Sequence, residues 1–126
     1  MDTANEKAVI LIDLRKRRLR IYKETLHGLH DPKLLLLLVN PESRSLMLMS
    51  CTDADPRAHR VDWAKLNSET SYELYSTGLV RQLHNLCPEW DSALSYRCIG
   101  DFNAKHTLAR FRIKDMVPVD GDNYGR

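Results

Sequence analysis

Residues 20–49, RIYKETLHGLHDPKLLLLLVNPESRSLMLM, contain the order of elements on which the fold depends. Residues 18–22 alternate between arginine and apolar side chains, as a strand with one buried face does. Residues 23–29 form a short segment with a glycine near its end, which favours one or two helical turns. The apolar run 33–39 predicts a strand buried on both faces, and the turn sequence NPES then leads to a return strand at 44–49.

The same order of elements recurs in the second half of the chain. Residues 72–75 (YELY) predict a strand, and Ser76 is a suitable N-cap for a helix that ends at Cys87, just before a proline. A second hairpin follows, with strands at 94–99 and 107–113. Strand, helix and hairpin therefore occur twice, which predicts an internal duplication.

These patterns predict an α+β fold made mainly of antiparallel sheet or barrel, with one longer helix. We expect a single domain over residues 1–114, in which two βαββ units, 18–50 and 71–114, are related by an internal pseudo-twofold axis. Residues 115–126 contain Pro, Gly, Asp and Asn and predict a loose tail. The patterns leave open whether the two units form one barrel or pack side by side.

Residues 20–49 resemble the swapped-hairpin unit of AbrB-like transition-state regulators, in which an arginine-containing strand precedes a short leucine-bearing helix and an apolar hairpin. The resemblance implies that two such units intertwine into one β-barrel and that arginines near the first strand contact DNA. The second unit of this chain would then replace the partner subunit, and Arg18, Arg20 and Lys23 would be DNA contacts. The chain is also similar to small proteins of Firmicutes, a likeness that implies no activity.

The basic charge of the chain is concentrated in one segment. The formal net charge is only +2, yet the nine residues 15–23, RKRRLRIYK, carry six positive charges and no negative one. Closely spaced Lys and Arg can neutralise phosphates, which favours a DNA-binding protein such as a transcriptional regulator. The alternative is a solvated turn, or edge charges that prevent aggregation. The candidate DNA-binding residues are Arg15, Lys16, Arg17, Arg18, Arg20 and Lys23.

Other candidate sites have weaker patterns. Arg110, Arg112 and Lys114 alternate along the last strand and form a second basic stripe. His27 and His30 are three residues apart, but a structural zinc site normally needs two tightly spaced pairs of ligands. We therefore expect no metal and no cofactor.

No catalytic motif is present, so we expect no enzymatic activity. The odd number of cysteines, without a C-x-x-C spacing, indicates a reducing compartment such as the cytoplasm. The longest apolar run is too short to cross a membrane. A non-catalytic protein-interaction or assembly module, such as a homo-oligomer, is the alternative to DNA binding. A small enzyme built from Cys51, His59 and the loop with Asp53 and Asp55 is a third hypothesis.

Overall fold

One nine-stranded sheet organises residues 7–52 and 55–119, which are the residues that the computed structural model describes. The strands are β1 (Ala8–Asp13), β2 (Arg18–Tyr22), β3 (Leu34–Asn40), β4 (Ser45–Cys51), β5 (His59–Arg60), β6 (Ser71–Tyr75), β7 (Ser95–Phe102), β8 (Leu108–Arg112) and β9 (Val117–Val119). The helices are α1 (Lys23–Gly28), α2 (Trp63–Leu66) and α3 (Thr77–Leu86), and a 3-10 turn, Ile113–Asp115, follows β8.

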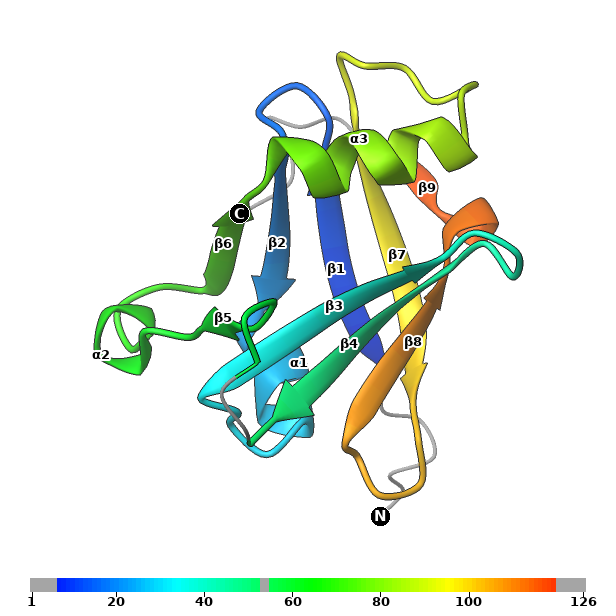
Figure 1. The fold of residues 1–126 in the computed structure, drawn as a ribbon. Helices are drawn as coiled ribbons and strands as arrows, with labels where there is room; N and C mark the ends of the chain where they lie inside the picture. The colour runs from blue at the N-terminus through cyan, green and yellow to red at the C-terminus, as the bar shows by residue number, and fades with distance from the viewer. Residues whose placement is uncertain (1–6, 53–54, 120–126) are drawn as a thin grey trace.

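The sheet curls into a half-barrel. Its strand order is β5-β3-β4-β8-β7-β1-β2-β6, all neighbours are antiparallel, and β9 pairs with β7. Strands β3 and β4 cross in front of β1, β2 and β7, while α3 lies across one open end and α1 lies towards the other (Figure 1). The long strand β7 belongs to both layers, since it pairs with β1 along most of its length and with β8 only near its end.

The core fills the space between the two layers. Inward side chains of alternating strand positions are almost fully buried, among them Ile12, Leu19, Leu48 and Phe111. Each such side chain contributes roughly 1.5–3 kcal/mol through removal of apolar surface from water. Helix α3 closes the end because its apolar face, with Val80 and Leu83, packs into the same cluster.

The local predictions agree well with the structure. The α+β class, the mainly antiparallel sheet and the α3 N-cap are confirmed: the Ser76 hydroxyl oxygen accepts a hydrogen bond from the backbone N–H of Leu79. On β8, Ala109 and Phe111 are buried whereas Arg110 and Arg112 are exposed, as the alternation predicted.

Three expectations differ from the structure. Strand β3 was expected to be buried on both faces, but Leu37, Leu38 and Val39 are only half-buried because β3 belongs to an outer layer. Strand β5 lies within a segment expected to be a loop. The first part of the expected loose tail contains β9, which pairs with β7; residues 120–126 lie outside the described part of the chain.

Among the described residues, no helix has the length and apolar character needed to span a membrane.

Candidate nucleic-acid interface

The β1–β2 turn carries three of the sequence-predicted DNA-binding residues, and none of the three forms an ion pair within the described residues. Arg15, Lys16 and Arg17 are consecutive and exposed. The turn has a defined shape, because the Lys16 backbone N–H donates to Oδ1 of Asp13 at 3.0 Å and Arg17 adopts a left-handed φ of 56°. Its cations therefore project from an ordered turn, which lowers the entropy lost when they bind a partner.

Arg18 and Arg20, in contrast, lie on the outer face of β2 in ion pairs. Nη1 of Arg18 donates to Oε1 of Glu73 at 2.9 Å, and its Nε donates to Oδ2 of Asp13 at 3.2 Å. Nη2 of Arg20 donates to Oε2 of Glu73 at 2.9 Å. The side chains of Arg18 and Arg20 are 11% and 17% exposed, so both guanidiniums are largely enclosed by the sheet and its carboxylates.

The pKa values of this cluster follow from its geometry. Burial opposes the charge on Arg18, but the hydrogen bond to the Tyr75 hydroxyl and the charge of Glu73 outweigh it, so the pKa of Arg18 is raised. Burial likewise opposes ionisation of Glu73, yet Arg18 and Arg20 outweigh it and lower the pKa of this carboxyl. Arg18 and Glu73 are therefore held in their charged forms, as a structural network requires.

Lys23 lies apart from the other candidates. It begins α1, at the end of β2 away from the turn, and its Nζ donates to the backbone oxygen of Asn67 at 3.4 Å. The six sequence-predicted residues thus occupy three places, and the structure groups only Arg15, Lys16 and Arg17 at an exposed surface.

Helix α3 adds a further cation beside the turn. The Ser76 backbone N–H donates to the Arg17 backbone oxygen at 3.1 Å, which joins the turn to the start of the helix. Arg17 and Arg81 both line a hollow of about 180 Å³, together with Thr77, His84 and other residues, and none of its described lining residues is acidic. We call Arg15, Lys16, Arg17 and Arg81 the basic end.

The exposed face of α3 is polar and carries no carboxylate. Arg81, Gln82 and Asn85 are exposed, and the helix sequence TGLVRQLHNL has no Asp or Glu. Amide side chains of this kind can hydrogen-bond phosphates or base edges. The helical period places Val80 and Leu83 on the buried face of this helix. The same period places Arg81, Gln82 and Asn85 on the opposite face, and only the fold brings that face next to the turn.

His84 is oriented by the backbone at the rim of this hollow. Its Nε2 lies 2.9 Å from the carbonyl oxygen of Trp90, and its ring stacks on the Trp90 indole at a centroid distance of 6.5 Å. Because a carbonyl oxygen only accepts, Nε2 carries the proton. The imidazole is thereby fixed as part of the hollow's wall.

The other histidines do not form a metal centre. His27 pairs with Asp31, and Nδ1 of His106 donates to the Gly28 carbonyl oxygen at 2.9 Å. No group of three or more potential metal ligands is arranged to hold an ion in residues 7–52 and 55–119.

The loop considered for catalysis is held by local contacts. Asp55 accepts hydrogen bonds from Nε and Nη2 of Arg57, which lower the pKa of Asp55. Cys51 is half-buried at the end of β4, His59 is half-buried in β5, and Asp53 lies outside the described residues. These contacts form a turn of the kind that Asp commonly stabilises.

The second basic stripe lies on different elements from the basic end. Arg110 and Arg112 are exposed on β8, where they face Met47 and Ser45 of β4 in register, and Lys114 follows on the 3-10 turn. The described chain therefore presents two separate basic surfaces, of which only the basic end includes a helix.

Comparison of the chain with protein-family models, with curated proteins and with solved structures found no match.

Proposed function

We propose that this protein binds duplex DNA through its basic end, as a regulator of transcription would. The observation that carries the proposal is that Arg17 of the exposed turn and Arg81 of α3 line one hollow without acidic lining residues, and that Arg15 and Lys16 directly precede Arg17 in the same turn. Cations held on an ordered turn beside an acid-free helix face match the phosphate backbone in charge and leave polar side chains for contact with bases.

The role of each group follows from its chemistry. The turn cations and Arg81 neutralise phosphates, while Gln82 and Asn85, exposed on the same helix, are suited to hydrogen bonds with base edges, since Gln and Asn pair well with adenine. Arg18 and Arg20 act indirectly. Their pairing with Glu73 fixes β2 against β6 and so positions the turn that precedes β2.

Four phosphate contacts set the expected strength of binding. Each neutralised phosphate contributes about −0.9 to the slope of log affinity against log salt, so the basic end should give a slope of roughly −3.6. Affinity should then fall by about two orders of magnitude between 50 mM and 200 mM salt. The small net charge of +2 makes a long-range, non-specific attraction weak, so contact at the basic end has to supply the affinity.

The AbrB-like resemblance and the internal duplication belong to the same proposal. Under the proposed pseudo-twofold axis β2 corresponds to β6, and β4 corresponds to β8. Each of these pairs is antiparallel, as twofold-related neighbours must be. The register supports the axis, since Arg20 lies opposite Glu73 and Met47 opposite Arg110 at the middle of each pair. In this arrangement the second unit takes the place of a partner subunit.

The test is fluorescence anisotropy with a labelled mixed-sequence DNA duplex at 50 mM and 200 mM salt. We compare the wild type with a variant in which Arg15, Lys16 and Arg17 are alanine, and with Arg81→Ala. The triple variant should lose most of the affinity at 50 mM salt and reduce the salt slope by about 2.7. Arg81→Ala alone should reduce the slope by about 0.9.

The matched control removes three cations elsewhere. A variant with Arg110, Arg112 and Lys114 changed to alanine has the same net charge as the turn variant but keeps the basic end. It should retain near wild-type affinity. Equal losses in the two triple variants would indicate non-specific attraction to net charge, and no wild-type binding at 50 mM salt would refute the proposal.

A second function is favoured by the outer face of the β3-β4-β8 layer. Leu38, Met47, Met49 and Leu108 are half-buried and lie outside the buried core cluster. Apolar side chains gathered on an outer sheet face are typical of a protein-interaction surface. In a non-catalytic assembly module of this kind, Met47→Glu would abolish association while the turn variant would not. If the protein binds DNA through its basic end, the turn variant lowers the anisotropy of the labelled DNA and Met47→Glu leaves it unchanged.

A further inference from the structure

A second hollow opens where β7 and β8 separate. These strands pair only at Asp101↔Arg110 and Phe102↔Ala109, next to the turn that joins them. Away from this turn, β7 pairs with β1 and β9, whereas β8 pairs with β4. The separation leaves a hollow of about 520 Å³ on the outer surface, within the roughly 300–1,000 Å³ range of small-molecule sites.

Gly100 sets the position of this separation. A Cβ on Gly100 would lie 2.3 Å from the Arg110 backbone oxygen and 2.6 Å from the Phe111 ring. Only a glycine therefore lets β7 pass this close to β8 before the two strands diverge. The hollow is thus a built feature of the sheet and does not depend on a loop.

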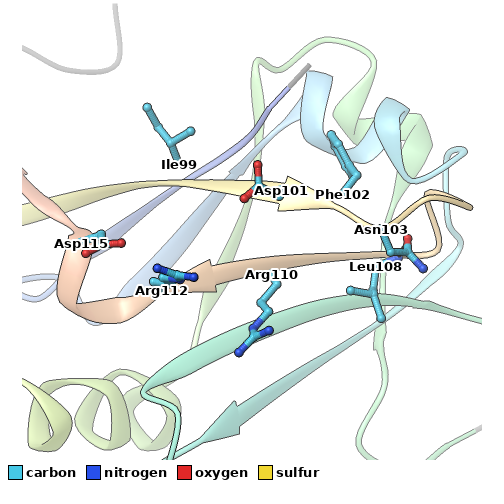
Figure 2. A pocket seen from close by; sticks show the side chains of 8 residues that line it. All are labelled: Ile99, Asp101, Phe102, Asn103, Leu108, Arg110, Arg112 and Asp115. Carbon is cyan, nitrogen blue, oxygen red and sulfur yellow. Dashed lines mark hydrogen bonds between the residues drawn. The ribbon is translucent and has the colours of Figure 1, made fainter. Parts of the chain in front are cut away.

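The hollow is lined by two arginines and by separate apolar side chains. Ile99, which is 53% exposed, and Leu108 provide apolar surface, while Arg110 and Arg112 extend from β8. Figure 2 shows the two arginines side by side along β8, with Ile99 on the neighbouring strand and Asp115 on the 3-10 turn. Because they are two residues apart on one strand, their Cα atoms are about 7 Å apart and both guanidiniums can reach one ligand.

Charge limits the ligand to a monoanion. Arg110 and Arg112 form no ion pair within the described residues, whereas Asp101 is neutralised by Lys7 at 2.6 Å. Asp115 is the remaining carboxylate of the lining, and it opposes a second negative charge on the ligand. A phosphate dianion or a nucleic-acid strand is therefore a poorer match than a single carboxylate, which guanidiniums bind through two parallel hydrogen bonds.

We propose that this hollow binds a carboxylate attached to an apolar body. The carboxylate lies between Arg110 and Arg112, and the apolar body packs on Ile99, which is level with Arg112. A small monocarboxylic acid and the C-terminal carboxylate of a peptide that ends in a large apolar residue share this chemistry. The site lies on elements separate from the basic end, so it stands or falls independently of DNA binding.

The experiment follows backbone amide signals of the ¹⁵N-labelled full chain in NMR titrations. The probes are 3-phenylpropionate, its neutral amide 3-phenylpropanamide, phenyl phosphate, and the peptide acetyl-Ala-Ala-Phe with a free or amidated C-terminus. We expect saturable shifts at Ile99, Gly100 and Leu108 with 3-phenylpropionate, and at least tenfold weaker binding of its amide. A peptide that binds more tightly than the small acid identifies a protein terminus as the source, and the reverse order identifies a small acid.

Substitutions test the contributions of the charged and the apolar lining residues separately. Arg110→Gln combined with Arg112→Gln should weaken 3-phenylpropionate at least tenfold, and Ile99→Ser should weaken it several-fold. Asp115→Asn should improve phenyl phosphate binding more than 3-phenylpropionate binding. The turn variant at Arg15, Lys16 and Arg17 is the matched control and should leave these affinities unchanged.

The outcomes decide the proposal. Absence of saturable shifts, equal affinity for the acid and its amide, or undiminished binding by the folded Arg110/Arg112 variant would each overturn it. Tighter binding of phenyl phosphate than of 3-phenylpropionate by the wild type would also overturn it, in favour of a phosphate site.

Discussion

Arg20 and Glu73 lie directly opposite each other where β2 pairs with β6, and Nη2 of Arg20 donates to Oε2 of Glu73 at 2.9 Å. Glu73 also accepts from Arg18, so one carboxylate bridges two guanidiniums on a largely enclosed sheet face. Nε of Arg20 is buried without a hydrogen-bond partner among the described residues. Arg18 and Arg20, which the AbrB-like resemblance implied as DNA contacts, are therefore held in ion pairs within the sheet.

Removal of this carboxylate should destabilise the fold. Glu73→Gln leaves Asp13 as the remaining ion-pair partner of Arg18 and removes the ion pair of Arg20. This change should lower the free energy of unfolding by about 1–3 kcal/mol. Urea denaturation measures the change. Glu69→Gln is the control, because Glu69 is exposed and its substitution should stay within about 0.5 kcal/mol. A Glu73→Gln value as small as that of the control would contradict the structural role of the network.

The same carboxyl gives a pH dependence with a defined sign. Because the pKa of Glu73 is lowered in the folded protein from its ordinary value of 4.5, its stabilisation is complete above that value and is lost as the pH falls through the lowered pKa. Stability measured by urea titration between pH 7 and pH 3 should therefore decline less in Glu73→Gln than in the wild type. Parallel declines of the two proteins would exclude this contribution.

Two glycines should respond oppositely to alanine. At Gly100 a Cβ would clash with the Arg110 backbone oxygen and the Phe111 ring, so Gly100→Ala should cost about 1–3 kcal/mol or more. At Gly78, in the first turn of α3, a Cβ meets nothing within 4 Å. Gly78→Ala should therefore stabilise the protein by up to about 1 kcal/mol. Thermal unfolding of both variants checks the contrast, and a neutral Gly100→Ala would show that β7 can move away from β8.

The cysteines should differ in reactivity. Cys98 is buried, and burial together with Asp115 raises the pKa of its thiol to about 12; burial also raises the pKa of Cys87. Because the thiolate is the reactive form, a thiol reagent at pH 8 should modify the half-buried Cys51 first. Mass spectrometry over time should show one label on the folded chain and three after denaturation. Rapid labelling of Cys98 in the folded chain would contradict its burial.

Sequence by itself determined the local elements and their faces. Alternation assigned the inward and outward residues of β8, and Ser76 marked where α3 begins. These features follow from interactions within a few residues, and short windows of sequence record them. The strands β5 and β9 span only two and three residues, too few to show a period, and were not predicted.

Tertiary structure alone decided which charges are available. The pairing of β2 with β6 places Glu73 against Arg18 and Arg20, and the contact between Ser76 and Arg17 places α3 beside the β1–β2 turn. The separation of β7 from β8 likewise creates the hollow around Arg110 and Arg112. Such pairings join segments far apart in the chain, and burial of complementary apolar faces selects them. Local sequence therefore shows where the arginines occur but not which of them the folded sheet neutralises.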